Sequence, residues 1–107
     1  ADCGAAALEI LKANPDIGLV ITDYNMPDID GFELTRRIRG AYGPHQLRII
    51  GVSSSNNRLL SARFLKAGGN DFMMRPFINE EFYCRVNQNL DTLTKIQSLG
   101  AKLAKSA

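Results

Sequence analysis

Three short apolar runs, separated by segments with helical periodicity, constrain the fold more than any other feature of the sequence. The runs are GLVITD at Gly18–Asp23, LRIIGVS at Leu47–Ser53 and DFMM at Asp71–Met74. The first two lack the alternation of a strand with one face in water, which indicates burial on both faces, as in a parallel sheet. The pattern therefore predicts an α/β fold with right-handed crossovers.

Segments with amphipathic helical spacing surround these runs. The second helix begins with Asp30 and Glu33 in a D-x-x-E pattern, which predicts a capping box. The last segment has apolar residues that step by three or four, which predicts one long helix to about Lys105, with Gly100 as the position most prone to a break or kink. The predicted helices cover residues 4–14, 31–40, a segment that ends near 67, and 79–105.

The composition is typical of one globular domain. The chain has 107 residues, 45% of them hydrophobic and 22% charged, with a net charge of +2. That balance does not indicate a nucleic-acid surface, and no apolar run approaches the ~18 residues that a membrane span needs. Cys3 and Cys84 lie far apart, which is typical of reduced thiols, with a disulfide or metal site as the alternative. We expect a cytoplasmic protein that binds neither nucleic acid nor membrane.

Polar residues stand where each predicted strand ends. They are Asp23, then Ser53 and Ser54, then Arg75. Ligands of open α/β sheets bind beyond the carboxyl ends of the strands, so these side chains are expected to meet at one edge. A carboxylate, hydroxyls and a guanidinium together suit phosphoryl transfer. Taken singly, they could be a turn former, helix caps and a surface charge.

Three separated motifs resemble those of response-regulator receiver domains, the phosphoacceptor modules of two-component signalling. They are VITDYNMPDIDGFEL, IIGVSS and AGGNDFMMRPF, and the resemblance runs from about Gly4 to Leu90. It implies a flavodoxin-like parallel sheet with helices on both faces. It also implies that a histidine kinase or a phosphotransfer protein is the partner.

The same resemblance implies roles for individual residues. Asp23 would be the phosphoacceptor and would hold Mg²⁺ together with the backbone carbonyl of Asn25. Ser53 would take the place of the switch hydroxyl, and Phe72 that of the aromatic switch. The peptide bond before Pro76 would be cis.

Two departures from the family pattern bear on activity. Arg75 stands where the family has lysine, and a planar fork is not equivalent to an ammonium at a crowded phosphate. The family's first strand, first helix and second strand, with the acidic pair that holds Mg²⁺, have no counterpart among Ala1–Thr22. We therefore expect residues 1–107 to be an N-terminally incomplete receiver domain. We expect Mg²⁺ binding to be weak or absent and phosphorylation of this chain to be inefficient.

The C-terminal residues 91–107 are predicted to be a helical extension or linker. An incomplete a/d seam runs along it, formed by Val86, Leu93, Ile96, Gly100 and Leu103. The helix could be an exposed tail, or a signalling helix that leads to an output domain or pairs in a homodimer. The stretch FINEEFYCRVNQNLDTL resembles the exit of receivers that precede diguanylate cyclase (GGDEF-type) domains.

Three functions compete at this stage. The first is a phosphoacceptor that receives a phosphoryl group on Asp23 and relays the signal to an output domain. The second is a degenerate, non-phosphorylated receiver that acts as a dimerisation or docking module, which Arg75 favours. The third is an aspartyl phosphohydrolase, which is disfavoured because Asn25 stands where that class needs a second carboxylate. We therefore do not expect an enzyme.

Overall fold

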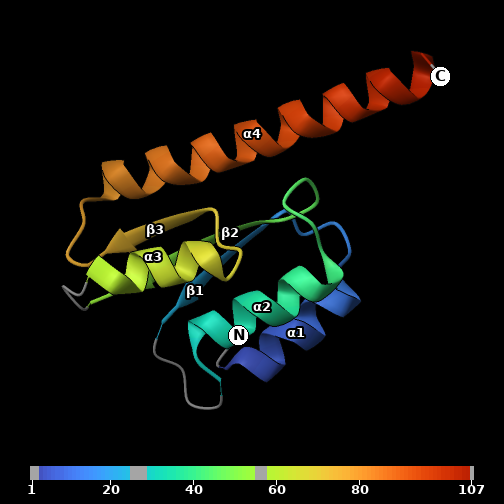
Figure 1. Ribbon diagram of the computed structural model, residues 1–107. Helices are drawn as coiled ribbons and strands as arrows, with labels where there is room; N and C mark the ends of the chain where they lie inside the picture. Colours follow the sequence, from blue (N-terminus) through green and yellow to red (C-terminus); the bar gives the residue numbers. More distant parts are fainter. Residues whose placement is uncertain (1–2, 25–28, 55–57, 107) are drawn as a thin grey trace.

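The computed structural model describes residues 3–24, 29–54 and 58–106, which form a layered α/β domain (Figure 1). Helices and strands alternate along the chain, as the sequence predicts. The elements are α1 (Gly4–Ala13), β1 (Leu19–Asp23), α2 (Gly31–Ala41), β2 (Arg48–Ser53), α3 (Arg58–Lys66), β3 (Asp71–Met74) and α4 (Asn79–Ser106). No helix of the described residues is long and apolar enough to cross a membrane.

The three strands form one parallel sheet in the order β1-β2-β3. The register pairs Asp23 with Val52 and Ser53 with Met74, so the three strands end side by side. The helices α1, α2 and α3 lie on one side of the sheet and α4 lies along the other (Figure 1). The predicted parallel sheet with helices on both faces is confirmed.

The main core lies between the sheet and the helices α1, α2 and α3. Its buried members are Leu11, Phe32, Leu34, Ile38, Leu47, Ile49, Leu60 and Phe64. Gly51 lets α3 approach β2 closely, because a Cβ there would lie 2.9 Å from the Phe64 ring. On the opposite face, Leu93 of α4 is 6% exposed and contacts the start of β1 at Gly18.

Strand β1 is less buried than its sequence predicts. Ile21 is 43% exposed, whereas its partner Ile50 on the central strand is fully buried. The difference follows from position, because β1 is an edge strand of the sheet formed by the described residues. Burial on both faces was the wrong expectation for β1 and the right one for β2.

Both ends of α2 are held by identifiable contacts. At the start, the Asp30 carboxylate accepts a hydrogen bond of 2.9 Å from the backbone N–H of Glu33, which confirms the predicted cap. Near the end, the Arg39 guanidinium donates to the carbonyls of Gly68 and Leu47, each at 2.7 Å, and to the Asn70 amide oxygen. Burial, reinforced by the positive charge of Arg48, lowers the pKa of Arg39.

Helix α4 runs from Asn79 to Ser106, which confirms the predicted long helix, and it does not end at Gly100. A glycine in a helix interior costs only about 1 kcal/mol relative to alanine, and the helical turns before it are already formed. The extension beyond the sheet is therefore one continuous helix with the part that packs on the sheet (Figure 1).

Candidate functional site

The candidate site lies at the carboxyl edge of the sheet. Asp23 is the last residue of β1, Ser53 is the last residue of β2, and Arg75 follows directly after β3. The parallel register brings these three chain positions to one edge. The structure therefore brings together the residues that the sequence singles out at the strand ends.

The guanidinium of Arg75 forms two hydrogen bonds with the carboxylate of Asp23. Nη1 donates to Oδ1 and Nη2 donates to Oδ2, each at 3.1 Å. This is the bidentate geometry that makes arginine a specific partner of carboxylate and phosphate groups. The side chains are 49% and 42% exposed, so water screens the pair and its contribution to stability is small. The contact therefore affects access to Asp23, because both of its carboxylate oxygens are occupied by Arg75, more than it affects stability.

The backbone around Arg75 fixes the direction from which it approaches. Its N–H donates to the Ser53 carbonyl at 2.8 Å, which continues the β2–β3 pairing by one residue. The Arg75–Pro76 peptide bond is cis, as the resemblance implies. Because β2 lies between β1 and β3, the guanidinium extends over the end of the central strand to contact Asp23 on β1.

The start of α2 packs directly under the phosphoacceptor candidate. The N–H of Gly31 donates to the Tyr24 carbonyl at 3.0 Å. A Cβ on Gly31 would lie 2.9 Å from the backbone oxygen of Asp23, so a residue with a side chain would push α2 away from β1. Asn25, with the backbone carbonyl expected to bind metal, lies outside the described residues.

The two candidate switch residues sit on neighbouring strands. Ser53 is 1% exposed at the end of β2. Phe72 is half-buried on β3, where it pairs with Gly51, and its ring lies 5.7 Å from the Phe64 ring of α3. A movement of the Phe72 ring would therefore displace its contact with α3. A switching role for either residue stays a prediction.

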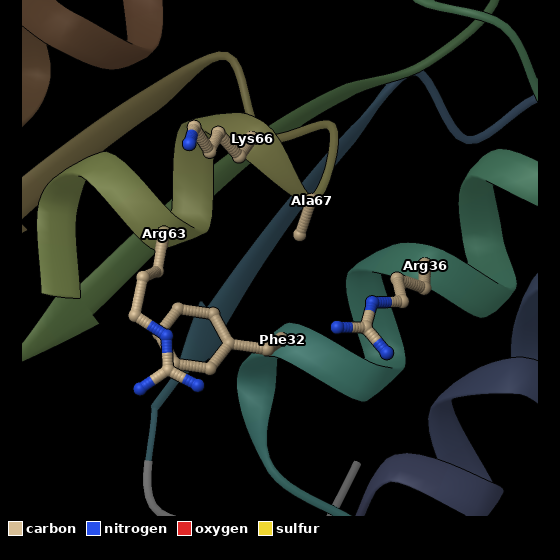
Figure 2. Close-up of a pocket in the computed structure, with 5 residues that line it drawn as sticks. All are labelled: Phe32, Arg36, Arg63, Lys66 and Ala67. Atoms are coloured by element: carbon tan, nitrogen blue, oxygen red, sulfur yellow. The ribbon is translucent and has the colours of Figure 1, made fainter.

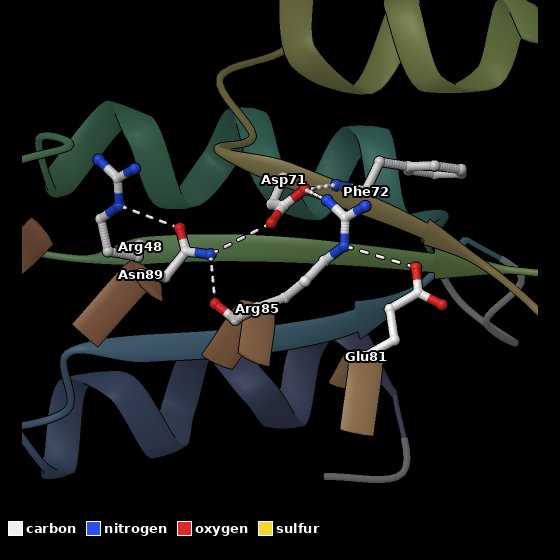
Figure 3. A network of polar contacts seen from close by, with 6 residues as sticks. All are labelled: Arg48, Asp71, Phe72, Glu81, Arg85 and Asn89. Atoms are coloured by element: carbon white, nitrogen blue, oxygen red, sulfur yellow. Dashed lines mark hydrogen bonds and ion pairs between the residues drawn. The ribbon is translucent and has the colours of Figure 1, made fainter. Parts of the chain in front are cut away.

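A network of polar side chains joins α4 to the opposite face of the sheet (Figure 3). Arg85 Nη1 donates to Asp71 Oδ1 at 2.6 Å, and Asn89 Nδ2 donates to Asp71 Oδ2 at 3.3 Å. The N–H of Phe72 donates to the same Oδ1 at 2.9 Å. Asp71 therefore links α4 to the backbone of the candidate aromatic switch.

Asn89 is the buried centre of this network. It is 5% exposed, its amide also donates to the Arg85 carbonyl at 2.8 Å, and its oxygen accepts from Arg48 Nε at 3.3 Å. The sequence reasoning missed these residues because they look like the polar face of an amphipathic helix. The signal that could have found them is Asn89 itself, a polar residue between the apolar positions Val86 and Leu93.

Residues 1–87 of the chain match the response regulator receiver domain family. The chain belongs to this family. Receiver domains are signalling modules without an enzymatic activity of their own, so the phosphohydrolase interpretation is set aside.

Relatives with known sequences agree with this assignment. The two-component response regulator ORR7 of Oryza sativa subsp. indica is 36% identical over 75 residues, which cover 70% of this chain and 36% of that protein. ORR5 of Oryza sativa subsp. japonica is 33% identical over 75 residues, 70% of this chain and 56% of that protein. The matched part of this chain thus spans between about a third and just over half of these relatives' length.

Solved structures share the fold. A two-component system response regulator/GGDEF domain protein is 50% identical with a TM-score of 0.81, covering 85% of this chain and 37% of that one. A response regulator from Chloroflexus aurantiacus J-10-fl is 31% identical with a TM-score of 0.73, covering 85% of this chain and 74% of that one. These likenesses extend over the sheet edge that carries the candidate site.

Receiver domains typically bind Mg²⁺, and the donors described here do not fit that ion. Mg²⁺ needs several oxygen ligands in octahedral geometry. Within residues 3–24, 29–54 and 58–106, no group of three His, Cys, Asp or Glu side chains could hold a metal. Both carboxylate oxygens of Asp23 already accept from Arg75. Among the described residues, the cation that contacts the Asp23 carboxylate is the guanidinium of Arg75.

Proposed function

We propose that this receiver domain accepts a phosphoryl group on Asp23 from a histidine kinase or a phosphotransfer protein of a two-component system. A carboxylate oxygen of Asp23 would form the new P–O bond while the P–N bond to the donor imidazole breaks. The imidazole nitrogen would then take up a proton. The product is an acyl phosphate on the β1 strand end.

The observation that carries the proposal is the convergence of Asp23, Ser53 and Arg75 at one sheet edge. Arg75 can offset the charge of the phosphoryl oxygens with the same fork that now holds the carboxylate. Ser53 supplies a hydroxyl at the neighbouring strand end for one of those oxygens. Phe72 on β3 packs against Phe64 on α3, so a movement of the Phe72 ring after phosphorylation would be transmitted to α3.

The Arg75 fork also makes phosphorylation slow in this chain. An incoming phosphoryl group competes with Arg75 for both carboxylate oxygens, and no acidic cluster among the described residues recruits Mg²⁺. These two facts support the second candidate, a degenerate receiver that serves as a dimerisation or docking module. The two candidates differ in whether Asp23 takes up phosphate at all.

Intact-mass spectrometry with acetyl phosphate and Mg²⁺ distinguishes them. We expect wild type to gain one phosphoryl group slowly and incompletely, and Arg75→Lys to gain it faster, because an ammonium cannot hold both oxygens of Asp23. Asp23→Asn should gain none. The degenerate-receiver proposal is supported if wild type and Arg75→Lys both remain unmodified. Rapid stoichiometric uptake by wild type would contradict the inhibitory role of Arg75.

We further propose that α4 connects the receiver to a C-terminal output domain, with residues 91–107 as the linker. Two observations support this: α4 is one helix from Asn79 to Ser106, and the response regulator/GGDEF domain protein matches this chain over 37% of its own length. A diguanylate cyclase is therefore the output domain to look for in the parent protein.

The exposed apolar residues of α4 support pairing with a second copy. Tyr83, Leu90 and Ile96 are 62%, 40% and 36% exposed. Light scattering over a concentration series tests the pairing, with Ile96→Glu as the disrupting variant and Thr94→Glu as the control on an exposed position of the same turn. We expect association that Ile96→Glu weakens and Thr94→Glu leaves unchanged. A monomer at all concentrations would exclude the homodimer.

A further inference from the structure

A pocket between α2 and α3 is lined largely by cations, and Asp23 is not among its lining residues (Figure 2). Its volume is about 220 Å³, and it is lined by Phe32, Arg36, Arg63, Lys66 and Ala67. Three of these five residues are cations and none is acidic. By contrast, a second pocket, beside α1 and α2, is lined by the acidic Glu9 as well as by Lys12 and Arg37, so its charges are mixed.

The cations of the α2–α3 pocket form few ion pairs with the rest of the described residues. Arg36 makes one exposed ion pair, 3.6 Å from Glu33, with side chains 69% and 40% exposed. Neither Arg63 nor Lys66 forms an ion pair within the described part of the chain. Arg36, Arg63 and Lys66 thus have only one weak ion pair among them, and a bound anion would balance part of this positive charge.

The floor of the pocket orients one of the cations. The Arg63 guanidinium lies over the Phe32 ring, 4.8 Å from its centroid, and Phe32 itself is only 6% exposed. Figure 2 shows the Arg36 guanidinium directed toward this ring from α2. Stacking on a buried ring limits the motion of Arg63, so less entropy is lost when its free N–H groups bind a ligand.

Size and chemistry together select the ligand. The pocket is smaller than the ~300 to 1,000 Å³ of sites for drug-sized molecules, so it suits a compact group. Guanidinium forks match the oxygen geometry of phosphate. We propose that the α2–α3 pocket binds a phosphate group, either free inorganic phosphate or the phosphate of a small phosphomonoester. Asp23 does not line this pocket, so the proposal does not depend on phosphorylation of Asp23.

Titrations followed by ¹H–¹⁵N NMR at constant ionic strength test the proposal. The probes are inorganic phosphate and glycerol 3-phosphate, and the reporters are the amides of Phe32 and Ala67. We expect saturable shifts with both probes. Tighter binding of glycerol 3-phosphate would identify an ester as the ligand, and equal or weaker binding would identify the free anion. Absence of saturable shifts with either probe would overturn the proposal.

The chain offers matched controls for each cation. Arg36 and Arg37 are neighbours on α2 and both pair with Glu33, but only Arg36 lines this pocket. We expect Arg36→Gln to weaken phosphate binding roughly tenfold and Arg37→Gln to leave it nearly unchanged, since one charge-assisted contact is lost in the first only. Equal weakening by both variants would show diffuse attraction to a basic surface and would refute a site.

Two further variants close the test. Lys66→Gln should weaken binding, whereas Lys12→Gln on α1 should not, and thermal unfolding checks that each variant is folded. Asp23→Asn should keep the phosphate shifts. If Asp23→Asn abolished them, the anion would be bound at the strand ends and the α2–α3 site would be excluded.

Discussion

Removing the Asp71 carboxylate should detach α4 from the sheet more than any other single change in the Figure 3 network. In Asp71→Ala, Arg85, Asn89 and the N–H of Phe72 all lose their common acceptor. The surface next to Asn89 is closed to solvent, since Asn89 is 5% exposed. The variant therefore leaves these donors without their acceptor in a place where water can replace only some of the lost hydrogen bonds.

The magnitude follows from these contacts. A hydrogen bond to a charged group contributes about 1.5 to 3 kcal/mol when it is shielded from water. The Arg85 side chain is 38% exposed, so water can replace its lost partner and its hydrogen bond contributes near the low end of that range. The hydrogen bond from Asn89 is long, at 3.3 Å, and contributes less than an ideal one. We expect the free energy of unfolding to fall by about 2 to 3 kcal/mol in total.

Urea denaturation measures this loss directly. With an m-value of about 1 to 3 kcal/mol/M, the midpoint should fall by roughly 0.7 to 3 M. Glu81→Gln is the control, because Glu81 pairs with the same Arg85 at 3.6 Å from an exposed position, and should cost under about 0.5 kcal/mol. If Asp71→Ala cost no more than Glu81→Gln, the network would not be what holds α4 to the sheet.

Three further substitutions test how the rest of the fold positions the site. Asp30→Ala removes the cap that accepts from Glu33 and should cost about 1 kcal/mol in urea denaturation, with a cost near zero counting against the cap. Arg39→Lys loses the planar guanidinium that donates to three backbone carbonyls and one side-chain amide oxygen, and should cost about 2 kcal/mol. An unchanged urea midpoint would contradict this stabilising role of Arg39. Gly51→Ala places a methyl 2.9 Å from the Phe64 ring and should lower the unfolding free energy by about 1 to 3 kcal/mol. An unchanged unfolding free energy would contradict the close packing of α3 on β2.

Most of the fold could be predicted because each element carries a local signal. The β3 strand was predicted at Asp71–Met74, its observed bounds, since a short apolar segment between glycines and a proline has few alternatives. The cap at Asp30 was predicted from a spacing that acts within one turn. The wrong detail, burial of β1 on both faces, arose because an apolar run does not show whether its strand lies at the centre or the edge of the sheet.

The candidate site was predicted by position but not by contact. Strand ends locate Asp23, Ser53 and Arg75 at one edge, because parallel pairing aligns them. The bidentate grip of Arg75 on Asp23 joins residues 52 positions apart, and no local pattern indicates which rotamer a long side chain adopts. The α2–α3 pocket escaped the sequence reasoning for the same reason, since Arg36 and Arg63 become neighbours only when two helices pack.

The central claim is that Asp23 is the phosphoacceptor and that Arg75 restrains it. The most direct measurement is borohydride reduction after treatment with acetyl phosphate and Mg²⁺, followed by peptide mapping, because reduction converts an aspartyl phosphate to homoserine at the modified position. We predict conversion at position 23, low in wild type and higher in Arg75→Lys. Conversion at another aspartate, or equal conversion at position 23 in both proteins, would contradict the account.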